Sequence, residues 1–527
     1  MDDVLTERRP SFIRRFLGDR PTVIAVLTAG FFALTFAVYW ITGPQDTPYV
    51  HHVNQANAFL HGRLDIVSQY AKNANLLERA LEDEQIELVK QGITPPPCGE
   101  VKCYLTHPPM PAIILLPLVA ISGLEVNQAL VSVFLAALTA ALVYRVTGAM
   151  TQDIRTQVLF TVLFMFGTIF WYTAANGGVW FISHSIAVMF LFLAIYATLV
   201  LKNPLLAGIG LGAAFLTRND AAWAIIFLVI MFSGRELLRP GGPVNSTGGQ
   251  AGASQRLARL ARRVNLKALV LIAVGTLPFV LFSFWFNYAR FGDILDSGYM
   301  HSEQNYQPQL SYLYVNGLFD ISYLHRNVPV AFERAPLFTT EPPYVIPYGY
   351  GMAIWMTTPA FLYAFFAGVK DKRIIAALGI GLAAATSAIL WTAASLGWDL
   401  GPLDADLTSS WQFMPFWAGI AVGIGAAVWL AIKERELLAI ACWATIVPIA
   451  LGNFVFAGWG QVQFGYRYAL EFYPFLFLLT MKGMGTELKW HHMLVIALSV
   501  VVNLWAMLWI YEFGAHMTNG WKWYEFF

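Results

Sequence analysis

Residues 22–42 read TVIAVLTAGFFALTFAVYWIT, a run of 21 residues without a charged side chain. A transmembrane helix needs about 20 mainly apolar residues, so this run is long enough to cross a bilayer. Further apolar runs predict spans at approximately 126–146, 157–175, 181–201, 204–217, 220–233, 267–288, 347–369, 374–396, 412–432, 436–457, 468–482 and 493–513. Together they predict an all-α polytopic membrane protein with about 13 transmembrane helices, some of them short and therefore tilted or broken.

The composition of the chain agrees with a membrane protein. Hydrophobic residues make up 57% of the 527 residues and charged residues only 12%. A soluble domain carries about 25% charged residues, so an ordinary soluble enzyme and a disordered chain are both excluded. The net charge of +1 gives no reason to expect a nucleic acid partner.

The charges of the connecting loops predict the sidedness. With the N-terminus inside, Lys and Arg prevail in the inner loops and Asp and Glu in the outer loops, which is the positive-inside pattern. This assignment excludes 109–122 as a span, because that run is short and contains Pro111 and Pro117, as suits an interfacial helix. We predict a multi-pass protein of the plasma (inner) membrane with a cytoplasmic N-terminus and an extracytoplasmic C-terminus.

Two outer loops, 43–125 and 289–346, are too long to be turns, and loops of this length are usually functional or disordered. They are rich in Tyr, His and Pro, so we expect them to be folded and the first to contain interfacial helices. The predicted segments are a basic cytoplasmic leader (1–21), an N-terminal membrane module with the catalytic residues (22–233), a flexible basic cytoplasmic loop (234–266), a C-terminal membrane module (267–513) and an extracytoplasmic tail (514–527).

Polar residues that could support chemistry gather on the outer side. Asp46 lies just past the first span, where a carboxylate could reach both a lipid headgroup and a water-borne acceptor. It could equally be a solvated loop residue that caps the following helix. His51, His52, His61 and Asp65 follow in the same stretch, but their spacing is loose for a zinc site.

Three other polar positions lie near the outer ends of predicted spans. Arg218 and Asp220 interrupt the apolar stretch 204–233, where they either pair with each other to close a hairpin or leave Arg218 to face an anionic headgroup. His184 begins a span, where a lone His is often a satisfied interfacial residue. Arg467 also begins a span, and Glu471 could pair with it across one helical turn.

Cys98 and Cys103 flank the sequence GEVK in the first outer loop. The outer compartment permits disulfides, and a small loop of this size can close sterically. We therefore predict a disulfide between them, with free thiols or a metal site that includes His107 as alternatives.

Five stretches resemble the GT-C class of polytopic glycosyltransferases, and most of all its bacterial lipid-carrier members, relatives of protein O-mannosyltransferases and aminoarabinose transferases. These stretches are the Asp46 region followed by NAFLHGRLDI (57–66), THPPMPAIILLPLVA (106–120), GLGAAFLTRNDAAW (210–223), FNYARFGDILDSGYMH (286–301) and QFGYRYALEFYPFLFLL (463–479). The order of the stretches and the large first outer loop extend the resemblance over most of the chain.

The resemblance implies transfer of a sugar from a polyprenyl-phosphate donor in the outer leaflet to an acceptor hydroxyl, with inversion. It implies that Asp46 is the catalytic base and that Arg218, Arg467 and His184 bind the donor phosphate. Implied acceptor or sugar contacts are His51, Asp65, His107, Tyr299, His301 and Tyr466. The short outer loop that comes next in the chain, AANGGVWFISHS (174–185), lacks the second acidic motif of some members, so we expect no metal cofactor, with a divalent ion as the alternative.

Two other classes of function remain open. A lipid-linked-glycan flippase or other transporter would have repeats and a binding site on broken helices at the membrane midplane. A non-catalytic subunit of a membrane complex would use the outer loops for docking. The sequence contains no nucleotide-binding motif, so this chain is not expected to hydrolyse a nucleotide.

Overall fold

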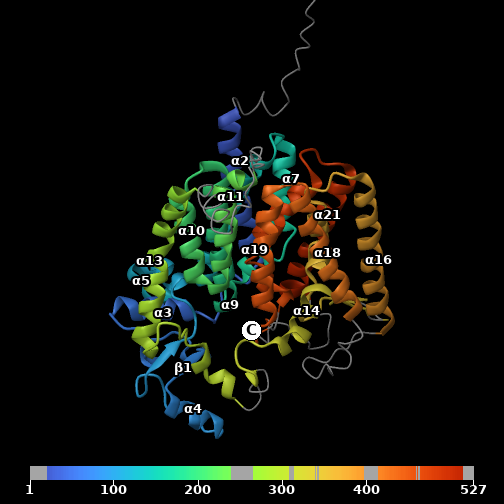
Figure 1. Cartoon of the computed structure of the whole chain (residues 1–527). Helices are drawn as coiled ribbons and strands as arrows, with labels where there is room; N and C mark the ends of the chain where they lie inside the picture. The colour runs from blue at the N-terminus through green and yellow to red at the C-terminus, as the bar shows by residue number, and fades with distance from the viewer. Residues whose placement is uncertain are drawn as a thin grey trace, which may run out of the picture.

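The computed structural model describes residues 20–238, 265–307, 314–338, 340, 344–396, 414–458, 460 and 463–513. Most of these residues form helices that run side by side in one bundle (Figure 1). Six helices are long and apolar enough to cross a membrane: α2 (Arg20–Thr42), α6 (Gln128–Met150), α9 (Val179–Tyr196, extended by a π-helical turn to Leu201), α13 (Leu266–Phe291), α19 (Leu437–Phe454) and α21 (Trp490–Leu508). The chain therefore has the helices of a membrane-embedded protein.

The predicted number of about 13 spans is not confirmed. Within the described residues, the pair α7 (Ile154–Phe166) and α8 (Phe170–Asn176) is apolar enough for a seventh span, but it is bent by 54°, as in a broken span or a re-entrant loop. The predicted spans 204–217, 220–233, 374–396, 412–432 and 468–482 correspond to helices with shorter apolar cores: α10 (Pro204–Thr217), α11 (Ile225–Leu238), α16 (Lys372–Leu396), α18 (Met414–Lys433) and α20 (Tyr473–Met484).

The prediction of a span at 347–369 was wrong. This segment begins with strand β5 (Tyr350–Met352), which pairs in parallel with β6 (Gln463–Gly465). The short helix α15 (Ile354–Thr357) and the 3₁₀ helix η10 (Pro359–Phe366) follow. Gly351 adopts a left-handed φ of 100°, and Pro359 lacks the amide needed to continue α15. The apolar composition reflects burial of irregular backbone inside the protein, where neighbouring segments satisfy its polar groups.

Small residues allow α10 to lie directly against α13. A Cβ atom on Gly208 would meet the carbonyl oxygen of Ile272 at 2.3 Å, and one on Gly275 would meet that of Leu205 at 2.5 Å. Apolar surface alone does not drive association between helices in lipid, so close backbone contact through small residues is the usual stabilising feature. Here it fixes the end of α10, which carries Arg218.

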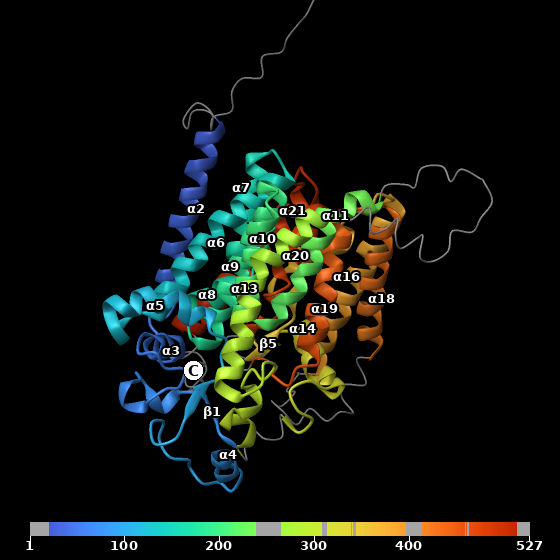
Figure 2. The ribbon, with the colours of Figure 1, turned by 60° about the vertical axis from the view of Figure 1, so that its left-hand side comes forward.

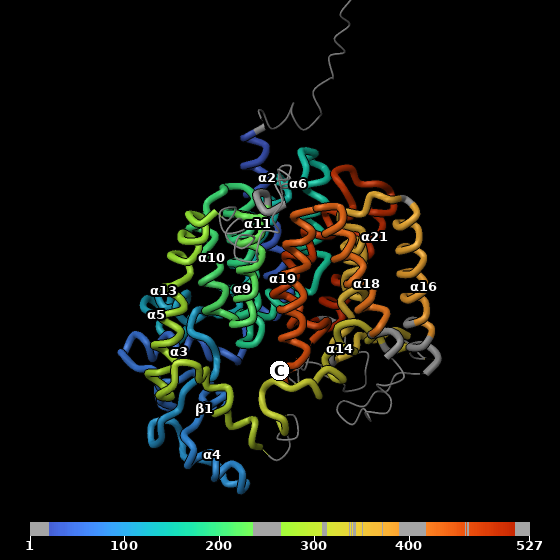
Figure 3. The backbone as a smooth tube through the Cα atoms, in the orientation of Figure 1, coloured from blue at the N-terminus to red at the C-terminus, as the bar shows by residue number. Residues whose placement is uncertain are grey.

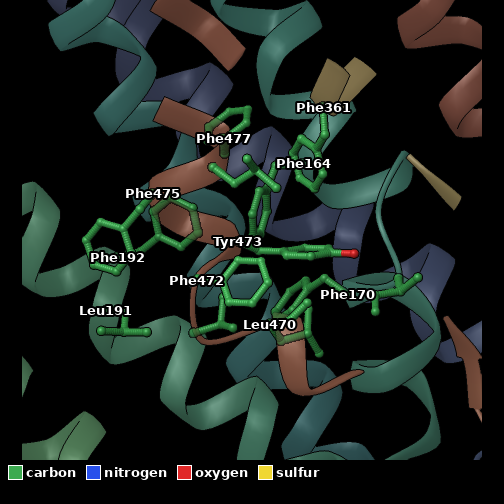
Figure 4. Close-up of a cluster of buried hydrophobic side chains, with 14 of the residues drawn as sticks. Phe164, Phe170, Leu191, Phe192, Phe361, Leu470, Phe472, Tyr473, Phe475 and Phe477 are labelled. Atoms are coloured by element: carbon green, nitrogen blue, oxygen red, sulfur yellow. The ribbon is translucent and has the colours of Figure 1, made fainter. Parts of the chain in front are cut away.

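Aromatic rings fill the space between α7, α9 and α20 (Figure 4). Phe164 packs edge-on against Phe192 with ring centroids 4.7 Å apart and against Phe477 at 5.2 Å. Edge-to-face packing of this kind stabilises beyond the area it buries. The rings thus join α7, α9 and α20 in one packed core.

The segment 43–125, here called the first outer loop after its predicted side, forms a folded layer at one end of the bundle (Figure 2). It contains α3 (His51–Leu60), α4 (Asp83–Lys90), the antiparallel pair β1 (Arg79–Leu81) and β2 (Cys103–Leu105), and α5 (Met110–Ser122). The segment 109–122 thus forms a 13-residue helix that lies against α3 and is too short to span. Cys98 and Cys103 form the predicted disulfide.

The second outer loop joins this layer. The guanidinium of Arg79 contacts both carboxylate oxygens of Glu303, at distances from 2.6 to 3.1 Å. A bidentate pair of this kind is stronger and more directional than a single contact. The elements of the second outer loop are η6 (Tyr299–His301), η7 (Glu303–Tyr306), η9 (Ile321–Tyr323), α14 (Leu324–Phe332), β3 (Leu337–Phe338) and β4 (Val345–Ile346). Strands β3 and β4 are antiparallel.

The opposite end of the bundle carries basic loops. Glu436, which precedes α19, forms ion pairs with Lys482 at 2.9 Å and with Lys370 at 3.2 Å. The N-terminal end of α2 and the turn between α6 and α7 lie at this end, far from α3 and α4 (Figure 3). The leader up to residue 19, most of the predicted inner loop (239–264) and the tail (514–527) lie outside the described residues.

Candidate functional site

A cavity of about 610 Å³ lies where the helical bundle meets the layer of outer loops. Its walls come from the start of α9, the end of α10, the segments that follow α13 and α19, and both outer loops. The charged and titratable side chains in its lining are Glu78, His107, His184, Arg218, Asp220, Tyr299, Tyr314, Arg467 and Tyr468. The cavity thus collects groups that are far apart in the sequence.

Arg218 lies in the wall of the cavity, where its partly buried side chain forms ion pairs. α10 ends there, and the extended backbone of Arg218 (φ −148°, ψ 119°) turns its side chain away from the helix axis. Its Nε lies 2.8 Å from Oε1 of Glu471 and 3.6 Å from Oδ1 of Asp220. The Asp220 pairing considered from the sequence is present, but the shorter contact is with Glu471.

Glu471 is fully buried and is shared between two partners. Its Oε1 lies 2.7 Å from Nδ1 of His184 and 2.8 Å from Nε of Arg218. A buried carboxylate is tolerated only when charges and hydrogen bonds compensate its lost hydration. The close cation of Glu471 is therefore Arg218, and not Arg467 as sequence spacing suggested, while His184 adds a hydrogen bond.

Aromatic rings set the positions of both guanidinium groups. The guanidinium carbon of Arg218 lies 5.2 Å from the centroid of the Tyr468 ring, and that of Arg467 lies 5.5 Å from the same ring. Arg467 also lies 5.0 Å from the Phe181 ring. Cations on aromatic faces are held without losing their charge, so both arginines stay available as cations in the cavity wall.

Glu78 is a second carboxylate in the cavity, and it is held by neutral donors. Its Oε1 accepts hydrogen bonds from Nε1 of Trp180 at 2.8 Å and Nε2 of Gln304 at 3.0 Å. Its Oε2 lies 3.4 Å from Nε2 of His107. Burial raises the pKa of Glu78 to about 7, so this carboxyl titrates near neutral pH.

Three histidines pack behind Glu78. The rings of His51 and His52 lie 5.5 and 5.6 Å from that of His107, and Nε2 of His51 accepts the backbone amide of Glu78 at 3.0 Å. Burial lowers the pKa of His51 to about 3, that of His52 to about 4 and that of His107 well below its usual value. The three imidazoles are therefore neutral near pH 7 and do not neutralise Glu78.

The structure brings half of the predicted site residues to the cavity. His107, His184, Arg218, Tyr299 and Arg467 line it. Asp46 does not belong to the lining. Its side chain is exposed, and its Oδ1 accepts the backbone amide of Thr47 at 2.8 Å. It is a loop carboxylate in solvent, and it caps no helix, since Val50 precedes α3 without a side-chain cap.

The other predicted contacts lie outside the lining. His51 supports the backbone of Glu78 from behind. Asp65 pairs with Arg63 on the surface of the first outer loop. His301 lies 2.7 Å from Asp296. Tyr466 is fully buried and donates its hydroxyl hydrogen bond to the carbonyl of Asn453 at 3.3 Å.

Glu78 is the functional candidate that sequence reasoning missed. It begins the acidic stretch ERALEDEQIE, which has the composition of a solvated surface helix. Its neighbours in space, Trp180 and Gln304, are 102 and 226 positions away in the chain. No local pattern marks Glu78, because only the folded contact between the two outer loops and α9 defines its environment.

Within the described ranges, no group of three or more His, Cys, Asp or Glu side chains has the arrangement of a metal site. No family model matches the chain, and no curated protein and no solved structure matches it. The function is therefore argued from the cavity.

Proposed function

We propose that this protein is a membrane glycosyltransferase that takes a sugar from a polyprenyl-phosphate donor and passes it to an acceptor hydroxyl. The observation that supports this best is the cavity with Arg218 and Arg467 in its wall, at the end of a bundle of apolar helices. Guanidinium groups suit phosphate, because their planar donors match its oxygens. A lipid phosphate would keep its chain beside the bundle and its head in the cavity.

His184 adds a further feature of a ligand site. Its ring is fully buried and lines the cavity. Nδ1 contacts Glu471, whereas Nε2 has no hydrogen-bond partner in the part of the chain that the structure describes. Buried polar atoms are rarely left unpaired. When Nδ1–H donates to Glu471, Nε2 of the neutral ring accepts, so a hydroxyl group of the sugar donor in the cavity would satisfy it.

In the proposed reaction, the acceptor oxygen attacks the anomeric carbon while the bond from that carbon to the phosphate oxygen breaks. Arg218 and Arg467 stabilise the charge that develops on the leaving lipid phosphate, which lowers the barrier when the donors are fixed in advance. A single displacement inverts the anomeric configuration. The reaction takes place on the outer side of the membrane in this proposal, as the loop charges predict.

The test uses the purified protein with radiolabelled polyprenyl-phosphate hexoses and pentoses and a panel of glycan, lipid and peptide acceptors. We expect label in an acceptor together with free polyprenyl phosphate. Arg467→Gln should lower turnover by about 10²-fold, as loss of a charge-stabilising donor does. Arg155→Gln, an exposed arginine at the other end of the bundle, is the matched control.

Other outcomes would identify the competing classes. Movement of the intact donor between the leaflets of vesicles, without released lipid phosphate, would show a flippase. Neither transfer nor movement with any donor would leave the protein as a subunit that docks partners through its outer loops.

A further inference from the structure

We propose that Glu78 is the general base that accepts the proton of the acceptor hydroxyl in this cavity. The proposal rests on the proposed glycosyl transfer and replaces Asp46, the base that the sequence resemblance implied. A general base must come within hydrogen-bond reach of the proton it takes, directly or through one water. Glu78 lines the cavity with the two arginines, whereas Asp46 is exposed outside its lining.

The surroundings of Glu78 fix its carboxylate. Trp180 and Gln304 both donate to Oε1, which leaves Oε2 beside His107 with only a 3.4 Å contact. The next residue, Arg79, forms an ion pair with Glu303 of the second outer loop, which fixes the backbone beside Glu78. The side chain of Glu78 is 13% exposed, so it is in contact with the cavity and little solvated.

Glu78 and Glu471 differ in the groups that contact their carboxylates. Arg218 and His184 lie within 2.8 Å of Glu471, so the contacts of this carboxylate orient the arginine. Among the described residues, no Lys or Arg forms an ion pair with Glu78. Glu78 lines the cavity and its hydrogen bonds come from uncharged donors, so it is the carboxylate placed to exchange a proton with an acceptor there.

The proposed transfer needs only the acceptor, the sugar donor and the Glu78 carboxylate. The acceptor O–H bond breaks as its proton passes to the Glu78 carboxylate and its oxygen forms the bond to the anomeric carbon. The bond between that carbon and the phosphate oxygen breaks, and the electron pair leaves with the lipid phosphate. The proton on Glu78 returns to solvent after the product departs.

The assignment predicts how the rate depends on pH. Since burial raises the pKa of Glu78 to about 7, kcat/KM should rise as pH increases through 7 and the carboxylate forms. In Glu78→Gln this rise should disappear. The titratable and charged groups that face Glu78 from the surrounding elements are Tyr49, His51, His107, Tyr299, Glu303, Tyr314 and Arg467.

The experiment compares Glu78→Gln and Asp46→Asn with the unchanged protein, and uses Glu84→Gln, an exposed carboxylate of α4, as the matched control. We expect Glu78→Gln to lower kcat by about 10²- to 10⁴-fold, the usual contribution of a general base. Binding of sugar-free polyprenyl phosphate, measured as a shift in Tm, should stay within about threefold. Asp46→Asn should keep most of its turnover.

Glu78→Asp provides a second variant, since it keeps the carboxylate and moves it by one methylene. It should retain the pH-dependent rise at a lower rate. If the unchanged protein is active and Glu78→Gln is too, the base assignment is wrong while the proposed function stands. An equal loss of lipid phosphate binding and of kcat would make Glu78 a structural residue. Absence of turnover by the unchanged protein with every donor would overturn both proposals.

Discussion

The buried triad of His184, Arg218 and Glu471 shows how single residues shape this cavity. Glu471 has no exposed surface, so its charge depends on Arg218 at 2.8 Å and on the hydrogen bond from His184 at 2.7 Å. Removal of one partner from a buried pair costs more than the pair contributes, because the remaining charge is left without compensation. The arginine of the cavity wall therefore has a structural role as well as a proposed role in binding.

Arg218→Ala should destabilise the protein by about 3–5 kcal/mol, because it leaves Glu471 buried without its cation. The double variant Arg218→Ala/Glu471→Gln should recover most of this loss. Thermal unfolding in detergent at fixed lipid content measures both. A double variant as unstable as the single one would mean that lost packing, and not the unpaired carboxylate, causes the effect.

Glu333 of the second outer loop predicts a pH dependence of stability. Its side chain is 1% exposed, and burial raises its pKa to about 8. The folded protein thus holds the proton more tightly than the unfolded chain, so stability falls as pH rises from the unfolded value of 4.5 towards 8. Glu333→Gln should have little effect on Tm near pH 5 and raise it near pH 8. A gain in Tm of equal size at both pH values would contradict this assignment.

At the scale of elements, α20 depends on close contact with η10. A Cβ atom on Gly483 would lie 1.9 Å from the carbonyl oxygen of Tyr363, so no side chain fits without a shift of backbone. Gly483→Ala should therefore destabilise by about 1–3 kcal/mol, the usual cost of overpacking. Gly379→Ala in α16 is the control, because its new methyl group would have no atom within 4 Å and Ala favours helix. Comparable Tm values for both variants would be inconsistent with the close contact.

The disulfide of the first outer loop should stabilise that layer locally. It closes a loop with a sequence separation of 5, for which chain entropy gives about 2 kcal/mol. Hydrogen exchange at the amides of Ile66 and Ser68, which bond to the carbonyls of Cys103 and Cys98, reports its opening. Cys98→Ser/Cys103→Ser should speed exchange at these amides by about 30-fold, with amides of α9 as the internal reference. Unchanged exchange would show that the layer is held by other contacts.

Sequence reasoning predicted elements best where one physical rule dominates. Long apolar runs gave α2, α6, α9, α13, α19 and α21, because lipid allows few alternatives to a helix. The rule failed at 347–369, where burial in protein produces the same composition as burial in lipid. Among site residues, Arg218 and His184 were recognisable as polar groups next to apolar runs, whereas Glu78 depends on contacts made only in the folded chain.

At the scale of the whole molecule, the two ends of the bundle differ in character. One end carries the folded outer loops and the cavity, and the other carries the ion pairs of Glu436 with Lys370 and Lys482. A donor with a long lipid chain can reach the cavity only from the leaflet at the same end. The proposed reaction therefore requires the cavity to face outward, as the loop charges predict.

Single cysteines can test this orientation. In a background with Cys442 replaced by Ala and the disulfide retained, Glu84→Cys marks the cavity end and Arg155→Cys marks the other end, both at exposed positions. A membrane-impermeant maleimide should label Glu84→Cys in intact cells and Arg155→Cys only after permeabilisation, because basic loops stay on the cytoplasmic side. The reverse pattern would place the cavity in the cytoplasm, where it would meet donors of the inner leaflet. Labelling of both positions in intact cells would contradict a bundle that crosses the membrane between them.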